Sequence, residues 1–180
     1  MSVSRALLRH TPMNLLVVPA GAGIAKIRLP QFSLVLVAVD FSDVSSEAVL
    51  NGCALLSPGG RLHLVHVVDP GGSPHGKYEA APIAVSFGTR HADHINRYAE
   101  RLSALIPVEA EKRGLITEVE VSEHREPAKA ICQAAERFGA DALCLGTHGH
   151  SGWSAILGSV TQSVLRQSSR PLFIVHPLPA

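Results

Sequence analysis

Short apolar runs alternate with segments of helical periodicity from about Ser33 to the end of the chain. This alternation is typical of parallel sheets whose strands are joined by helical crossovers. The first run, LVLVAV, contains no polar residue, as expected of a strand that is covered on both faces. We predict five strands, at residues 34–39, 61–68, 116–121, 142–145 and 172–175. The third alternates Ile and Val with polar residues, which indicates a position near the sheet edge.

The segments between these strands carry helix start and stop signals. Ser and Asp oxygens at residues 42–45 can cap a helix that ends near Leu56, before a Ser-Pro-Gly-Gly stretch. A second helix is predicted over residues 89–113, with an interruption near Pro107. A third runs over residues 127–138, where it starts with proline and is closed by glycine, and a last helix follows Ser159.

Composition excludes several classes of protein. The formal net charge is +1, which gives no electrostatic reason to expect nucleic acid or a membrane surface as a partner. No apolar run reaches the length of a membrane span. The three cysteines lie far apart without metal-finger spacing and are interpreted as reduced core residues. We therefore expect a cytoplasmic protein.

The first thirty residues do not fit the alternating plan, but they resemble the end of the chain. Residues 2–18, SVSRALLRHTPMNLLVV, align without gaps with residues 159–175, SVTQSVLRQSSRPLFIV. One explanation is chance, since many short amphipathic helices followed by a strand would match. The other is that the segment is the tail of an earlier copy of the same domain. We expect residues 14–19 to pair with the strand at 172–175, within one chain or in a dimer.

The fourth strand leads into a glycine-rich loop, GTHGHSGWSAILGSV, at residues 146–160. Its glycines let a ligand approach the backbone closely. Gly158 and Ser159 then open a helix, whose free N–H groups and positive end favour a phosphate. The loop also leaves the carboxyl end of a central parallel strand, where open α/β sheets bind ligands. The alternative is a tight strand-to-helix turn without a ligand.

Other site motifs fail on spacing. The chain has neither the GxxxxGK[ST] of a P-loop nor the GxGxxG of a dinucleotide site. A GxSxG nucleophile elbow would need glycine where Trp153 stands, so serine hydrolysis is not expected. His148 and His150 stand two residues apart without a third ligand at sensible spacing, and we predict no metal site. His66 lies on an apolar strand and is interpreted as a satisfied core or interface histidine.

Over roughly residues 33–177 the sequence resembles the universal stress protein family. The matching stretches are VAVDFS at the end of the first strand, VHVVDP after the second, and FGADALCLGTHG at the loop. ATP-binding members of that family have Gly-x-x-Gly, nine residues, and then Gly-Ser/Thr. Here Gly146 and Gly149 are followed by only eight residues before Gly158 and Ser159. Because phosphate binding depends on several converging amides, a loop shorter by one residue changes where those amides point.

The resemblance implies a binding site that can be carried over residue by residue. Ala38 and Asp40 would meet the ribose or adenine, and Val67 and Leu145 would line the adenine pocket. The loop residues would surround the ribose and phosphates: Gly146, Gly149, Gly158, Ser159 and Val160. Each has a plainer explanation, which is a helix N-cap for Asp40 and core packing for Ala38, Val67 and Leu145.

The resemblance also implies a fold and a function. The fold is a Rossmann-like, five-stranded parallel open sheet of the adenine nucleotide α-hydrolase type, with helices on both faces and strand order 3-2-1-4-5. Residues 1–30 would be an extension from a preceding domain, and residues 31–180 the universal stress protein domain. The expected function is binding of ATP, with Mg²⁺, in a stress or regulatory role, with at most weak ATP hydrolysis. The alternative is a nucleotide-free interaction module that forms a homodimer through its terminal strand.

Overall fold

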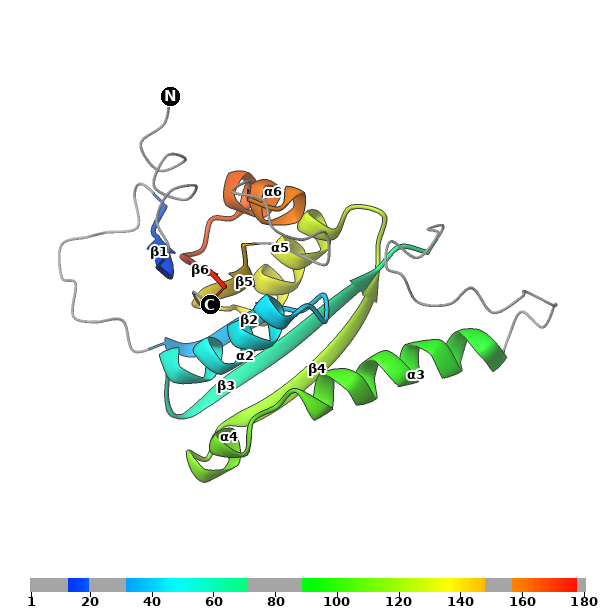
Figure 1. Cartoon of the computed structure of the whole chain (residues 1–180), viewed down its shortest axis with the longest axis horizontal. Coiled ribbons are helices and arrows are strands. Elements are labelled where there is room, and N and C mark those ends of the chain that lie inside the picture. The colour runs from blue at the N-terminus through cyan, green and yellow to red at the C-terminus, as the bar shows by residue number, and fades with distance from the viewer. Residues whose placement is uncertain (1–12, 20–31, 71–88, 148–156, 178–180) are drawn as a thin grey trace.

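The computed structural model describes residues 13–19, 32–70, 89–147 and 157–177. They form an α/β fold with one six-stranded sheet in the order β1-β6-β5-β2-β3-β4 (Figure 1). The strands are β1 (Leu15–Val17), β2 (Phe32–Ala38), β3 (Leu56–Val68), β4 (Ile116–Glu123), β5 (Ala142–Gly146) and β6 (Leu172–Val175). The helices are α2 (Asp43–Leu55), α3 (Thr89–Ala104), α4 (Val108–Lys112), α5 (Pro127–Phe138) and α6 (Ser159–Gln167).

The five predicted strands are present, parallel, and in the predicted relative order, 3-2-1-4-5. The prediction of a five-stranded, wholly parallel sheet is nevertheless wrong. A sixth strand, β1, pairs antiparallel with β6 and makes the sheet mixed. The physical reason is that β6 would otherwise leave a row of unpaired backbone groups at the sheet edge. The expectation that residues 14–19 pair with the terminal strand is confirmed, within one chain.

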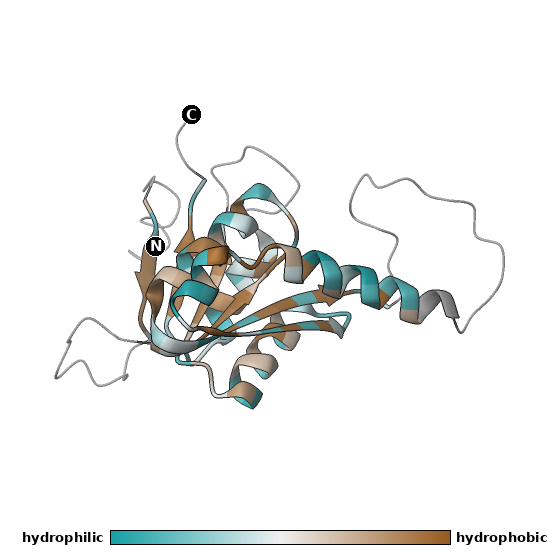
Figure 2. Ribbon diagram, turned by 90° about the horizontal axis from the view of Figure 1, so that it is seen from below, coloured by the Kyte–Doolittle hydropathy of each residue, from teal (hydrophilic) through white to brown (hydrophobic). Residues whose placement is uncertain are grey.

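The sheet separates two apolar cores. On one face, α2, α3 and α4 pack through residues such as Val49, Leu102 and Ala110. On the other, α5 and α6 pack through residues such as Ile131 and Val164. Figure 2 shows brown, apolar residues gathered in the sheet and teal, polar residues along the outer part of α3. The central strand β2 is therefore covered on both faces, as its unbroken apolar sequence predicts.

The helix boundaries follow local sequence signals. α5 begins at Pro127 and ends before Gly139, which has φ +67° in the left-handed region that favours glycine. The predicted interruption near Pro107 separates α3 from α4. The helix predicted to end near Leu56 stops at Leu55, and β3 already begins at Leu56, five residues earlier than predicted. The Ser-Pro-Gly-Gly stretch therefore follows the helix at the start of β3, where the pairing register with β2 shifts between Phe32 and Leu34.

Close backbone approach explains one glycine inside a helix. A Cβ atom built on Gly52 of α2 would lie 2.6 Å from Cγ2 of Val37 on β2. Glycine in a helix interior is usually destabilising, but here any side chain would push α2 away from the sheet. Arg113 holds the C-terminal end of the same helix, since its guanidinium donates to the carbonyls of Cys53 and Leu56.

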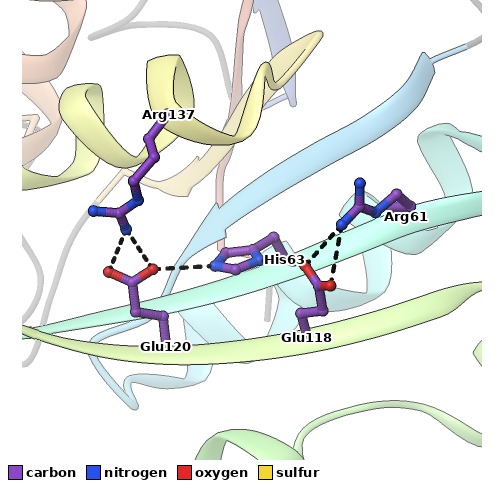
Figure 3. Close-up of polar contacts among 5 residues, drawn as sticks. All are labelled: Arg61, His63, Glu118, Glu120 and Arg137. Carbon is purple, nitrogen blue, oxygen red and sulfur yellow. Dashed lines mark hydrogen bonds and ion pairs between the residues drawn. The ribbon is translucent and has the colours of Figure 1, made fainter.

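A row of charged side chains crosses the edge of the sheet on β3, β4 and α5 (Figure 3). Arg61 pairs with Glu118 at 3.0 Å, and Arg137 pairs with Glu120 at 2.6 Å. Between the two carboxylates lies His63, buried at 4% exposure, with nitrogen-to-oxygen distances of 3.2 and 3.5 Å. Hydrogen bonds from His63 and Arg61 lower the pKa of Glu118. These charged side chains account for the alternation of polar and apolar residues in β4, which is the edge strand.

The two-sided burial of β2 gives a direct stability test. Leu36 of β2 is fully buried, so Leu36→Ala should lower the free energy of unfolding by about 2–5 kcal/mol, measured by urea denaturation. Leu50 of α2 is 50% exposed and serves as the matched control. Leu50→Ala should change the free energy of unfolding by no more than about 0.5 kcal/mol. Equal losses in the two variants would contradict the described core.

Candidate nucleotide-binding edge

The chain diverges at the carboxyl ends of the neighbouring strands β2 and β5. After β2 it turns into α2, which packs on one face of the sheet. After β5 it leads to α6, which packs on the opposite face. Such a point, where successive crossovers leave in opposite directions, forms a crevice in which open α/β sheets bind ligands. Most of the predicted site residues lie at this edge.

Asp40 is exposed at the β2 side of this edge and organises the start of α2. Its Oδ1 accepts hydrogen bonds from the Ser42 backbone N–H at 3.0 Å and from the Ser42 hydroxyl at 2.6 Å. Ser42 Oγ in turn accepts from the N–H of Ser45 at 3.2 Å, which makes Ser42 the N-cap. Asp40 is therefore not the cap itself. It orients the residue that caps the helix.

The backbone between Asp40 and Ser42 is strained. Phe41 has φ +64°, in the left-handed region that bulky side chains rarely adopt. The two hydrogen bonds that Ser42 donates to Asp40 join the residues before and after Phe41 and hold it in this conformation. A tight turn is thereby fixed directly after β2, with the Asp40 carboxylate at the protein surface.

On the β5 side, hydrogen bonds fix the two stems of the glycine-rich loop against each other. The Gly158 N–H donates to the Thr147 carbonyl at 2.7 Å. Thr147 N–H donates to Val175 of β6 at 2.8 Å, and the Thr161 hydroxyl donates to the Gly146 carbonyl at the same distance. The start of α6 is thus tied to the end of β5. Residues 148–156 lie outside the described residues. This range includes the predicted site residue Gly149 and the pair His148 and His150.

Gly146 has a packing role that the sequence did not reveal. A Cβ atom built on it would lie 2.9 Å from Cγ1 and 3.3 Å from Cβ of Val44 in α2. Both atoms belong to a branched side chain near its backbone and cannot swing away. Glycine here lets α2 approach β5, whether or not a ligand binds.

The other predicted residues differ in accessibility. Ser159 and Val160 are exposed at the first turn of α6, with Gly158 as N-cap. Ala38 and Val67 are half-buried against the α5/α6 core, and Leu145 is buried at 3% exposure. The edge thus brings together an exposed carboxylate, an exposed helix start and two partly accessible apolar side chains. Leu145 lies beneath them in the core.

Sequence reasoning missed an aromatic cluster that borders Asp40. The ring centroids of Phe41 and His66 lie 4.6 Å apart, those of His66 and Tyr98 also 4.6 Å, and Arg101 lies 3.9 Å above the Phe41 ring. The His66 Nδ1 lies 2.7 Å from the Val39 carbonyl, which confirms His66 as a satisfied histidine. Only Tyr98 offered a sequence signal, because it lies at helical spacing from Ile95 and Leu102 in the helix predicted over residues 89–113.

Two absences hold for the described part of the chain. Among residues 13–19, 32–70, 89–147 and 157–177, no group of three His, Cys, Asp or Glu side chains is arranged to hold a metal ion. None of the helices in those ranges has the length and apolar character needed to cross a membrane.

Comparison with known proteins identifies the family. The model of the universal stress protein family matches residues 32–176, and the chain therefore belongs to that family. Universal stress protein A homolog 1 of Coxiella burnetii is 25% identical over 132 residues, which cover 73% of this chain and 87% of the relative.

Solved structures show the same fold. Hypothetical protein MJ0577 superposes with a TM-score of 0.63 at 21% identity, covering 84% of this chain and all of the other. A universal stress protein from Archaeoglobus fulgidus DSM 4304 gives 0.62 at 24% identity, covering 97% of this chain but 54% of its own.

Two further relatives were solved with nucleotides. A universal stress protein in complex with cAMP gives a TM-score of 0.57 at 22% identity, covering 82% of this chain and 99% of the other. One from Archaeoglobus fulgidus in complex with dAMP gives 0.51 at 20% identity, covering 83% and 99%.

The position of His66 predicts a pH dependence of stability. Burial lowers the pKa of His66, against smaller opposing effects of the Val39 carbonyl and the Asp40 charge. The unfolded histidine takes up a proton below about pH 6.5 while the folded one resists it, so stability falls as the pH drops below that value. His66→Gln should show a smaller loss of unfolding free energy between about pH 7.5 and about pH 5.5. Equal losses in urea denaturation would contradict this assignment.

Proposed function

We propose that this chain binds an adenine nucleotide across the carboxyl ends of β2 and β5. The observation that carries the proposal is the start of α6, where Gly158 is tied to Thr147 and where Ser159 and Val160 are exposed. The first N–H groups of a helix lack intrahelical partners and carry its positive partial charge. They suit a phosphate, to which the Ser159 hydroxyl can also donate.

Asp40 fits the ribose. Its carboxylate is exposed at the end of β2, and carboxylate oxygens accept the kind of hydrogen bond that ribose hydroxyls donate. Ala38 and Val67 are the predicted residues with apolar surface for the adenine ring. Leu145 would support that surface from beneath, since its side chain belongs to the core. Gly149 stays part of the proposal as a loop residue.

ATP with Mg²⁺ is the proposed nucleotide form, with the metal held chiefly by the phosphates. Efficient phosphoryl transfer would need a positioned general base and a lysine or arginine that binds the phosphates. The sequence contains no recognised motif that provides either group. The proposed role is therefore cytoplasmic stress or regulatory signalling through binding, with at most weak hydrolysis. The cAMP and dAMP complexes of two relatives support an adenine nucleotide as the ligand class.

The second candidate is a nucleotide-free interaction module that dimerises through its terminal strand. Two observations favour it. Gly146 is required by its contact with Val44, so this part of the glycine motif has a role without a ligand. The edge of β6 also accepts an antiparallel strand, β1.

We also propose that residues 1–30 derive from the last helix and strand of a preceding universal stress protein domain. The gap-free repeat between residues 2–18 and 159–175 supports this origin. So does the fold-level match to the Archaeoglobus fulgidus DSM 4304 protein, in which 97% of this chain corresponds to about half of the other.

Binding can be tested by calorimetry and thermal unfolding with ATP, AMP and cAMP, each with and without Mg²⁺. A ligand that binds only the native state should stabilise it, by about 2.7 kcal/mol at a hundredfold excess over Kd. Stabilisation by ATP that requires Mg²⁺ would support the ATP proposal, and stabilisation by AMP alone would restrict it to a monophosphate. No stabilisation by any of the three would overturn it in favour of the interaction module.

A single substitution separates binding from stability. Ser159→Asp places a carboxylate at the start of α6, which the helix dipole favours but a phosphate does not. The variant should keep or gain thermal stability in the absence of ligand and bind nucleotide at least about tenfold more weakly, a change of about 1.4 kcal/mol. Ser169→Asp, exposed beyond the other end of α6, is the matched control and should bind like the parent. An unchanged nucleotide affinity of the Ser159→Asp variant would mean that the phosphate does not bind at the start of α6.

A further inference from the structure

Phe41 joins the strained turn after β2 to helix α3. Its ring centroid lies 4.6 Å from that of His66 on β3, and the guanidinium of Arg101 lies 3.9 Å above its face. The ring of Tyr98 stacks beside it, with centroids 5.8 Å apart and an interplanar angle of 17°. Tyr98 and Arg101 stand three residues apart and therefore share one face of α3. Phe41 thus links α3 to the turn that carries Asp40.

The core holds only the later part of α3. Leu102 is the one buried residue among positions 92–104 of this helix, and Ile95 is half-buried. Towards its start the helix is polar and exposed, as the teal residues along its outer part in Figure 2 show. Helices in proteins are stabilised mostly by the packing of an apolar face, so a segment with few apolar contacts opens easily. The contacts of Tyr98 and Arg101 with Phe41 therefore dock a part of α3 that the core does not hold.

The same contacts offset the backbone strain at Phe41. A bulky residue with φ +64° persists only where its surroundings hold it there. On the backbone side, Phe41 is held by the hydrogen bonds that Ser42 donates to Asp40. On the ring side, it is held by the contacts with α3. Loss of the ring contacts would let Phe41 relax to an ordinary negative φ, and the Asp40 carboxylate would move with it.

The residue type at position 41 supports a role for the ring. Glycine adopts a φ of +64° without strain, and asparagine or aspartate adopts it more readily than phenylalanine does. A phenylalanine here therefore loses stability in its backbone and recovers it only through its side-chain contacts. Phe41→Gly separates the two effects, because it keeps the turn accessible and removes the ring that reaches α3.

We propose that Phe41 is a positioning residue through which α3 controls the Asp40 side of the nucleotide site. The proposal rests on the ribose-binding role given to Asp40 above. While α3 is docked, the turn holds the carboxylate in place, and when α3 undocks the turn relaxes and the carboxylate moves. Because coupling between two sites is reciprocal, a nucleotide that fixes Asp40 also stabilises the docked helix. Nucleotide binding therefore changes the exposure of α3 without contact between the ligand and the helix.

The first test needs no nucleotide. Tyr98→Leu removes the stacked ring and should accelerate amide hydrogen exchange about tenfold at Ser42 and Ser45, whose N–H groups are hydrogen-bonded within the turn. The buried Val37 of β2 is the internal reference for global unfolding and should exchange as in the parent. Tyr98→Phe keeps the ring, and Arg97→Leu changes an exposed neighbour, so both should exchange like the parent. Unchanged exchange in Tyr98→Leu, or an equal acceleration at Val37, would overturn the proposal.

A double-mutant cycle tests the link to the nucleotide, with ATP and Mg²⁺ as the probe in calorimetry. Tyr98→Leu should weaken binding about tenfold in the parent and have no effect in a Phe41→Gly background, where no ring connects α3 to Asp40. The same effect in both backgrounds, whether a loss or none, would contradict the role of Phe41. A parent that binds no nucleotide, together with faster exchange at Ser42 in Tyr98→Leu, would overturn the proposed function and leave the control of the turn by α3 supported.

Discussion

The architecture depends on the central strand β2, which is paired on both edges and buried on both faces. Its parallel neighbours β3 and β5 can be reached only by helical crossovers, which must lie on the faces of the sheet. Because the chain leaves β2 for one face and β5 for the other, the two following turns face a common crevice. The candidate site is a consequence of this topology before any side chain is considered.

Much of the fold was predictable where local and tertiary preferences agree. α5 has the predicted bounds because Pro127 and Gly139 define its ends chemically, and β6 has them because its apolar run is short and isolated. β3 was predicted too short at its start. Pro58 and two glycines, whose local preferences favour turns, form an irregularity in the register there. Leu56 before them pairs with Phe32 of β2, a long-range contact that local sequence does not reveal.

The candidate site was predictable in outline but not in the roles of its residues. The apolar strand and the following Asp40 were enough to locate this edge of the sheet. The hydrogen bonds that the Asp40 carboxylate accepts from Ser42 could not be predicted from them. The aromatic cluster joins Phe41 of the turn after β2 with His66 of β3 and Tyr98 of α3, which lie far apart in the chain, so no local motif spans it. The repeat indicated that β1 must pair, whereas choosing between cis and trans pairing required three dimensions.

The close approach of Gly146 to Val44 bears on how glycine motifs are interpreted in this fold. Gly146, the last residue of β5, marks how near α2 comes to the sheet, which is an architectural requirement. A chain that had lost its ligand would still need it. Positions without such a packing role are therefore the informative ones for judging whether a homologue retains a ligand, above all the exposed hydroxyl at position 159.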